Sequence, residues 1–173
     1  MDDATFIYVY IINFKTPRII AQNIHSEVNV SYDAVEGLVN LHPMQSYFFD
    51  KINRNNFAQE FILKSKVNLD ISTLQKAFDE LTNLHDMLRA TFTVQNGKWV
   101  QTVLPQNERI CRINELKEEG DLDETILKVI ANANSALDIS KKLVDVTLLH
   151  HAGQCYLIFV IHHLIIDGVS WSI

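Results

Sequence analysis

Residues 157–171 read LIFVIHHLIIDGVSW, and this stretch decides how the rest of the chain is interpreted. Five apolar residues lead into His162 and His163, and three more lead into Asp167 and Gly168. Such a run predicts a buried strand, where histidine and aspartate side chains need hydrogen bonds or charged partners. Because consecutive strand residues face opposite sides, we expect one histidine to pack in the interior and the other to face an opening.

Three interpretations of the histidine pair remain open from the residues alone. The first is a pair of core histidines at a strand end, and the second is a metal site. A metal site would recruit ligands from a set of five, although neither cysteine is suitably spaced to help: His150, His151, His162, His163 and Asp167. The third is a general base, because a neutral imidazole titrates near about pH 6.5. Asp167 would then order the loop through a buried ion pair, and Gly168 would allow a turn that a side chain obstructs.

The segments before this stretch alternate between helix and strand patterns. Helices are expected over 41–52, from Asp70 or Ser72 to 84, and over 122–136, and strands over 57–67, 89–94, 98–104, 109–113, 143–150 and 155–163. The dipeptides Asn96-Gly97 and Ala152-Gly153 predict hairpin turns, and Ser72 with Gln75 forms a possible capping box. This order predicts an α/β or α+β fold with a mixed sheet.

Composition excludes several classes of protein. The 173 residues suffice for one domain with a full core, and 15 basic against 21 acidic residues give a net charge of −6. That sign disfavours nucleic acid as a partner. The longest early apolar run, Phe6–Ile12, is far below the roughly 20 residues of a membrane helix. With two cysteines and no secretory pattern, we expect a cytoplasmic protein without membrane contact.

Two further segments extend the argument from the histidine stretch. Residues 41–49 read LHPMQSYFF and residues 85–92 read HDMLRATF. Together with the HHxxxDG pattern of residues 162–168, they resemble the ordered motifs of nonribosomal peptide synthetase condensation and epimerisation domains. The resemblance spans residues 38–173 and implies a chloramphenicol-acetyltransferase-like fold. It implies that these residues form the N-terminal lobe of such a fold, with the second lobe absent from this chain, so that the chain alone is expected to be inactive.

The same resemblance implies a role for each motif residue. His163 is the catalytic histidine, and His162 is its structural neighbour. Asp167 pairs with Arg89 to maintain the architecture, and Gly168 is the motif glycine. Backbone donors near the Asp167-Gly168 turn are expected to help stabilise a developing oxyanion on the substrate. No metal and no directly bound cofactor is implied, because the phosphopantetheine arm arrives on a carrier domain with the substrate.

The subfamily follows from the residues around these motifs. The runs 167–171, DGVSW, and 43–49, PMQSYFF, resemble epimerisation domains more than condensation domains. The implied activity inverts Cα of a carrier-tethered aminoacyl or peptidyl thioester in secondary-metabolite and antibiotic biosynthesis. The alternatives are a condensation lobe that forms peptide bonds, and a non-catalytic lobe that docks a carrier domain. The implied partners are a peptidyl carrier domain and the second lobe.

The N-terminal region has a separate interpretation. Residues 14–24, FKTPRIIAQNI, resemble the last helix of a peptidyl carrier domain, with Thr16 as the N-cap and Pro17 at the first helical position. The alternative is an amphipathic helix that belongs to the lobe itself. The expected division is therefore a helical segment over 1–25, a linker over 26–37, and the lobe over 38–173.

Overall fold

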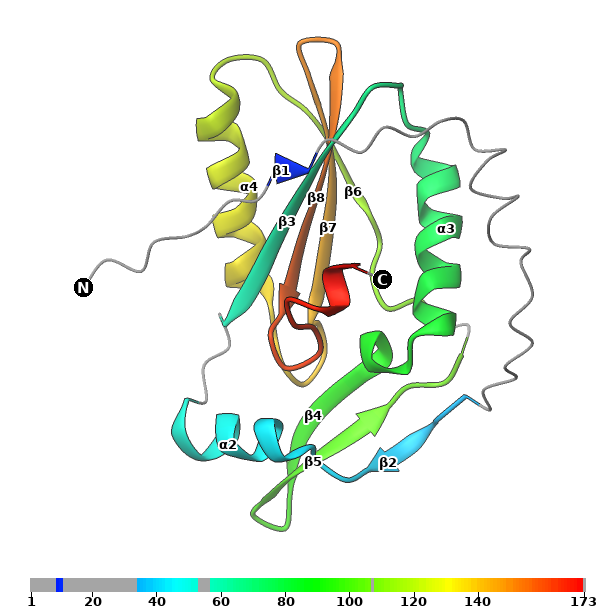
Figure 1. The fold of residues 1–173 in the computed structure, drawn as a ribbon, viewed down its shortest axis with the longest axis vertical. Coiled ribbons are helices and arrows are strands. Elements are labelled where there is room, and N and C mark those ends of the chain that lie inside the picture. Colours follow the sequence, from blue (N-terminus) through cyan, green and yellow to red (C-terminus); the bar gives the residue numbers. More distant parts are fainter. Residues whose placement is uncertain (1–8, 11–33, 53–56, 107, 173) are drawn as a thin grey trace.

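The computed structural model describes residues 9–10, 34–52, 57–106 and 108–172, and it arranges them as two sheets with flanking helices (Figure 1). A five-stranded sheet has the order β1-β3-β8-β7-β6, and a three-stranded sheet has the order β2-β5-β4. In chain order, with η for 3₁₀ helices, the elements are β1 Val9–Tyr10, β2 Gly37–Val39, α2 Pro43–Lys51, β3 Ala58–Ser65, α3 Ile71–Leu84, η1 Asp86–Arg89, β4 Ala90–Gln95, β5 Lys98–Val103, β6 Asn114–Lys117, α4 Leu122–Ala136, β7 Val144–His151, β8 Gln154–His162 and η2 Ser170–Ser172. The expected mixed α/β class is confirmed.

The antiparallel hairpin β7–β8 forms the centre of the larger sheet. Its turn, Ala152-Gly153, takes φ values of 47° and 74°, in the left-handed region that the sequence suggested. Strand β3 pairs antiparallel with β8, and β6 pairs parallel with β7. The long apolar run of β8 is therefore hydrogen-bonded on both sides, and it carries the histidine pair to one end of the sheet.

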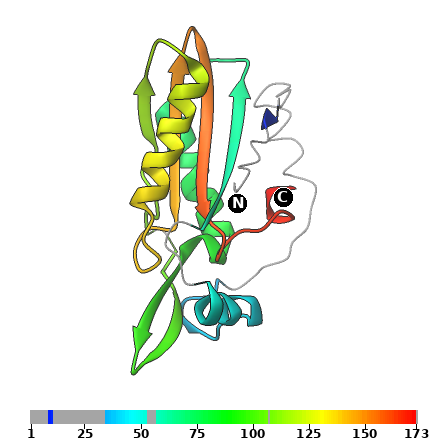
Figure 2. The same ribbon diagram turned by 90° about the vertical axis from the view of Figure 1, so that its left-hand side faces the viewer.

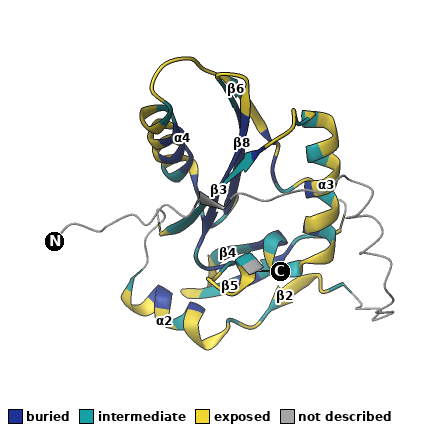
Figure 3. Cartoon of the chain, turned by 45° about the horizontal axis from the view of Figure 1, so that its top comes forward, coloured by how far each residue is buried: buried dark blue, intermediate teal, exposed yellow. Residues whose placement is uncertain are grey.

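Helices cover both faces of this sheet, which explains why consecutive residues of β7 and β8 are buried rather than alternating between buried and exposed. On one face, Ile126 and Ile130 of α4 pack against Ile158. On the other face, Phe78 of α3 belongs to the cluster that contains Leu157. Figure 2 shows α4 against the sheet from the side, and Figure 3 shows the buried strands between helices whose outer surfaces are exposed. Among the described residues, every helix is too short or too polar to cross a membrane.

Both long helices begin at an aspartate that accepts a backbone N–H. Asp70 accepts from the N–H of Thr73 at 2.8 Å, and Asp121 accepts from that of Glu124 at 2.8 Å. The capping box expected between Ser72 and Gln75 is wrong, because Ser72 lies inside α3 and donates its hydroxyl to Asp70. The Asn96-Gly97 hairpin is confirmed, since both residues take positive φ between β4 and β5.

Two further expectations need correction or lie outside the described residues. The strand expected over 109–113 is wrong, and β6 begins at Asn114 instead. The reason is Gln75, whose side chain donates to the carbonyl of Cys111 and accepts from the N–H of Ile113. These backbone groups are thus bonded to α3 rather than to a neighbouring strand. The helix expected over 14–24 and most of the expected linker lie outside the described residues, whereas Val9–Tyr10 form the strand β1.

Candidate functional site

His162 is the last residue of β8 and is fully buried, with 0% of its surface exposed. Its backbone N–H donates to the carbonyl of Leu143 at 2.8 Å, and its Nδ1 accepts the N–H of Leu164 at 3.2 Å. The ring of Phe48, from α2, lies edge-on to the imidazole with centroids 5.5 Å apart. Through these contacts His162 links the strand end to the loop that follows.

His163 follows at the point where the strand ends, and its side chain is only partly buried. Its backbone N–H donates to the carbonyl of Phe57 at 2.8 Å, and its ring stacks on that of Phe57 with centroids 5.0 Å apart. Nδ1 lies 2.8 Å from the carbonyl oxygen of Ile166. Because a carbonyl oxygen only accepts, Nδ1 carries the hydrogen and Nε2 of the neutral ring is left as the proton acceptor. The expectation that the two histidines have different surroundings is confirmed.

The Nε2 atom of His163 faces the side-chain amide of Gln59, with the two nitrogens 3.2 Å apart. Gln59 in turn accepts the indole N–H of Trp171 at 2.8 Å. Reasoning from the sequence did not identify Gln59. The available signal was a single amide at position 59, between Phe57 and Phe61 on one side of the expected strand.

Asp167 caps the last turn of the described chain rather than forming a buried ion pair. Its Oδ1 accepts from the N–H of Val169 at 3.1 Å and from the N–H and hydroxyl of Ser170 at 2.8 and 2.7 Å. The hydroxyl of Ser170, its N–H and that of Val169 hold the pKa of this exposed carboxyl below its usual value, with a smaller contribution from the charge of His163. These two N–H groups bind the carboxylate of Asp167, and the expected role of donors near this turn toward a substrate oxygen stays a prediction.

The expected explanation for Gly168 is also wrong. A Cβ built at this position meets no described atom within 4 Å, and its φ lies outside the left-handed region. Nothing in the described residues explains the requirement for glycine there.

Arg89 does not pair with Asp167, which corrects the sequence expectation. Arg89 is completely buried beside the second sheet and pairs with Asp86 at 2.7 Å, whereas Asp167 is exposed at the end of the larger sheet. The other partners of its guanidinium are four backbone carbonyls, those of Thr82 at 2.6 Å, Leu104 at 3.0 Å, Asn83 at 3.1 Å and Val35 at 3.3 Å. With these groups Arg89 joins the end of α3 to the second sheet.

The segment 41–49 directly contacts the residues between β8 and η2, 163–169, called the histidine loop below. His42 caps α2, and Gln45 completes a capping box by accepting the backbone N–H of His42 at 2.7 Å. The amide of the same Gln45 donates to the carbonyl of Leu164 at 3.3 Å, while Phe48 packs against His162. The motifs at 41–49 and 162–168 therefore contact each other, and the motif at 85–92 contacts the first of them through Phe92, whose ring lies 5.5 Å from that of Phe49.

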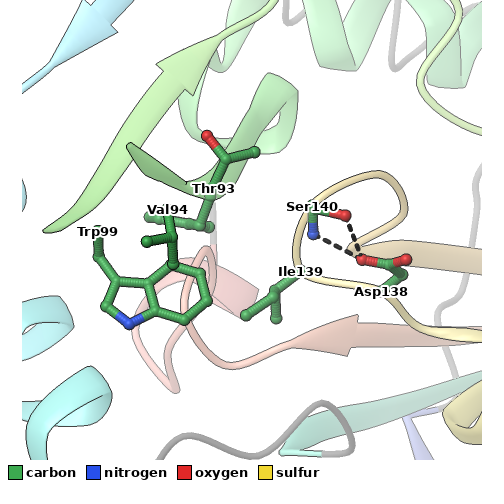
Figure 4. Close-up of a pocket in the computed structure, with 7 residues that line it drawn as sticks. Thr93, Val94, Trp99, Asp138, Ile139 and Ser140 are labelled. Atoms are coloured by element: carbon green, nitrogen blue, oxygen red, sulfur yellow. Dashed lines mark hydrogen bonds between the residues drawn. The ribbon is translucent and has the colours of Figure 1, made fainter. Parts of the chain in front are cut away.

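A cavity of about 490 Å³ lies elsewhere, between β4, β5 and the segment before β7 (Figure 4). None of the histidine-motif residues lines it; its walls are Phe92, Thr93, Val94, Trp99, Asp138, Ile139 and Ser140. Asp138 accepts from the backbone N–H and hydroxyl of Ser140, at 2.8 and 2.6 Å, so its carboxylate belongs to a local turn. The cavity and the histidine site are separate features.

The residues weighed as metal ligands divide between the two ends of the β7–β8 hairpin. His150 contacts Glu115 at 2.9 Å and the sulfur of Cys155 at 3.3 Å, and His151 contacts the carbonyl of Gly120 at 2.9 Å. These lie at the turn end of the hairpin, opposite His162 and His163. Within the described ranges, no three histidine, cysteine or acidic side chains gather as a metal site requires.

The sequence of this chain matches a known protein family. The family model described as "Condensation domain" matches residues 35–173. Bacitracin synthase 3 of Bacillus licheniformis is 29% identical over 153 residues, which cover 86% of this chain and 2% of that protein. Surfactin synthase subunit 2 of Bacillus subtilis (strain 168) is 32% identical over 146 residues, covering 80% of this chain and 4% of that protein. The chain thus spans only a small share of the curated relatives it matches.

Solved structures give the same result for the fold. The epimerization domain from the third module of tyrocidine synthetase B superposes with a TM-score of 0.75 at 26% identity, covering 80% of this chain and 33% of that one. The first condensation domain of the calcium-dependent antibiotic synthetase, in complex with a substrate analogue, superposes with a TM-score of 0.63 at 14% identity, covering 80% and 35%. The second likeness shows a shared fold, and the chain spans about a third of each solved domain.

Proposed function

This chain belongs to the condensation-domain family of nonribosomal peptide synthetases, and we propose that it forms the N-terminal lobe of an epimerisation-type member. In this proposal the substrate is an aminoacyl or peptidyl group held as a thioester on the phosphopantetheine arm of a carrier domain. The reaction inverts the Cα centre of that group. The carrier domain and a second lobe are the partners that the activity requires.

The observation that carries the proposal is the state of His163. Its Nδ1 donates to the carbonyl of Ile166 at 2.8 Å, which leaves Nε2 as the acceptor, and its side chain remains partly exposed at the strand end. A neutral imidazole oriented in this way is suited to removing a proton near neutral pH. The buried His162 fixes the strand end and the loop, so the two histidines divide support and chemistry between them.

Nε2 of His163 forms a bond to the Cα proton, and the electron pair of the broken C–H bond moves into the thioester to give an enolate. A second acid on the opposite face then donates a proton to Cα, and both groups exchange protons with solvent before the next turnover. We assign the second acid to the second lobe. Inversion results because the proton leaves one face and arrives at the other.

Epimerisation is favoured over condensation by the degree of likeness to the solved domains. The epimerization domain superposes with a TM-score of 0.75 at 26% identity, against 0.63 at 14% for the condensation domain. Trp171 in the DGVSW run adds support, because its indole is bonded within the site. Condensation is the second candidate, since the matching family model carries that description. In that reaction, the same Nε2 takes a proton from the attacking amine.

The experiment compares the two reactions in one polypeptide that joins this lobe to a second lobe. One loaded carrier domain is supplied in deuterated water, and the released amino acid is analysed by mass and chirality. Deuterium at Cα together with mixed chirality supports epimerisation. Absence of deuterium, with dipeptide formed once a second loaded carrier is added, overturns the proposal in favour of condensation. Absence of both reactions overturns a catalytic role and favours the docking lobe.

A further inference from the structure

A chain of hydrogen bonds runs from Trp171 to His163 through the side chain of Gln59. The indole Nε1–H of Trp171 donates to Oε1 of Gln59 at 2.8 Å. The amide nitrogen of Gln59 lies 3.2 Å from Nε2 of His163, and Nδ1 of that ring lies 2.8 Å from the carbonyl oxygen of Ile166. Four groups from β3, the histidine loop and η2 are thereby connected.

The donor and the acceptor of every hydrogen bond in this series follow from the groups at its two ends, the indole of Trp171 and the carbonyl of Ile166. An indole N–H can only donate, so the atom of Gln59 that faces Trp171 is the carbonyl oxygen. The amide NH₂ of Gln59 must then face His163, and it donates to an Nε2 that carries no hydrogen. At the other end, the carbonyl of Ile166 only accepts, so Nδ1 of His163 carries the hydrogen. Both ends independently require the same tautomer of His163.

Two members of this series of hydrogen-bonded groups, Trp171 and His163, are held in place by aromatic stacking. Trp171 stacks on Phe61, with ring centroids 4.8 Å apart and an interplanar angle of 15°. Phe57 stacks on His163 with centroids 5.0 Å apart. Gln59 lies between Phe61, on the same side of β3, and Phe57, which immediately precedes that strand, so both of its neighbours along this side are stacked rings. The cap that Asp167 provides to the last turn holds Trp171 at the required position.

We infer that Gln59, oriented by Trp171, is a positioning residue that holds His163 in the Nδ1–H tautomer with Nε2 as the proton acceptor. The bond to Trp171 prevents the amide of Gln59 from rotating to present its oxygen. After Nε2 gains a proton, two N–H groups therefore face each other, and the amide does not retain the proton on the ring. The inference rests on the proposed function only in treating Nε2 as the catalytic base; the tautomer itself is a property of the lobe.

The test is nuclear magnetic resonance of this chain labelled with ¹⁵N in its histidines, at about pH 8.5, above the ordinary titration range of histidine. Long-range proton–nitrogen correlations distinguish a protonated from an unprotonated ring nitrogen, and His163→Gln identifies the His163 signals by their loss. In the native chain we expect an unprotonated Nε2 and a protonated Nδ1. A protonated Nε2 in the native chain overturns the inference.

Two substitutions separate the contributions of Gln59 and Trp171. Gln59→Glu keeps the acceptor for Trp171 but has no donor for Nε2, so we expect the Nε2 signal to move into the protonated range. Trp171→Phe keeps the stack on Phe61 and removes the indole N–H, so the amide can rotate and both tautomers become populated. The matched control is Gln154→Glu, the same change at an exposed position on the other end of β8, which should leave His163 unchanged.

The NMR results test the tautomer of His163 whether or not the lobe is catalytically active. An Nε2 signal in Gln59→Glu identical to that of the native chain and the control overturns it. If Gln59→Glu does not give a dispersed, folded spectrum, Trp171→Phe decides, and an unchanged tautomer there overturns the role of Trp171. A confirmed tautomer combined with a lobe that fails the deuterium experiment rejects the proposed function and leaves this inference standing.

Discussion

Arg89 and Asp86 form an ion pair of 2.7 Å within the 3₁₀ turn η1, and the arginine side chain has no exposed surface. Four backbone carbonyls accept from the same guanidinium, at 2.6 to 3.3 Å. A buried guanidinium is tolerated when its donors are satisfied in this way. The arginine of the second motif therefore stabilises the junction between α3 and the second sheet, and it acts on the histidine site only through the fold.

The first prediction concerns this pair, in which Arg89 is buried and the Asp86 side chain is 33% exposed. Arg89→Met should lower the free energy of unfolding by roughly 3–5 kcal/mol, because it leaves a carboxylate and four carbonyls without their donor. In a double-mutant cycle with Asp86→Asn, measured by urea denaturation, the two changes should cost less together than the sum of each alone. The matched cycle of Arg89→Met with Asp167→Asn should be additive. Coupling between Arg89 and Asp167 would contradict the arrangement found here.

The second prediction concerns the contact between α2 and the histidine loop. Gln45→Leu removes the acceptor for the N–H of His42, in a partly buried environment, and the donor for the carbonyl of Leu164, in a buried one. We expect a loss of about 1–3 kcal/mol in the free energy of unfolding, since buried polar groups are left unpaired. Gln154→Leu, at an exposed position, is the control and should change stability by less than about 0.5 kcal/mol. Equal effects of both changes would show that Gln45 does not link the two segments.

The third prediction is a pH dependence of the turn that carries Trp171. Hydrogen bonds hold the pKa of Asp167 below its ordinary value of 3.8, so their contribution is fully present above that pH. It is lost as pH falls below 3.8 and passes through the lowered folded-state pKa. The indole N–H signal of Trp171 should therefore shift in acid, while that of Trp99 serves as the internal reference.

The control for this titration is Asp167→Asn, because an amide oxygen can accept the same N–H groups without titrating. The Trp171 signal of that variant should lack the acid transition. A transition of equal size in the variant and the native chain would assign the change to another carboxyl group.

Much of the fold could be predicted from local sequence. The Asn96-Gly97 turn marked its hairpin because asparagine and glycine adopt positive φ cheaply, and in the Ala152-Gly153 turn only the glycine gives that signal. The opposite surroundings of His162 and His163 followed from the two-residue period of a strand. The strand expected over 109–113 was misplaced because Gln75, which lies far away in sequence, bonds the backbone there. A side-chain contact between residues this far apart in sequence produces no pattern in the residues around either of them.

The site could be predicted only in part, for the same reason. The motif pattern points to His163 as the base, which stays a prediction, and the expected partner of Arg89 is wrong because the nearer acid, Asp86, lies three positions away in the same turn. Gln59 was not identified, since its role depends on Trp171, 112 positions further along the chain. A residue such as Gln59, which acts through another side chain, can be recognised only once the fold shows that β3 lies beside the histidine loop.

The central claim is that Nε2 of His163 removes the Cα proton of a carrier-tethered thioester, and the rate of deuterium incorporation at Cα tests it most directly. The measurement compares the native residue, His163→Gln and the control His151→Gln, all in a polypeptide that joins this lobe to a second lobe. A positioned general base contributes roughly 10²–10⁴-fold to a rate, so His163→Gln should lower incorporation by that factor while His151→Gln leaves it unchanged. Incorporation at the native rate in a folded His163→Gln variant would contradict the account.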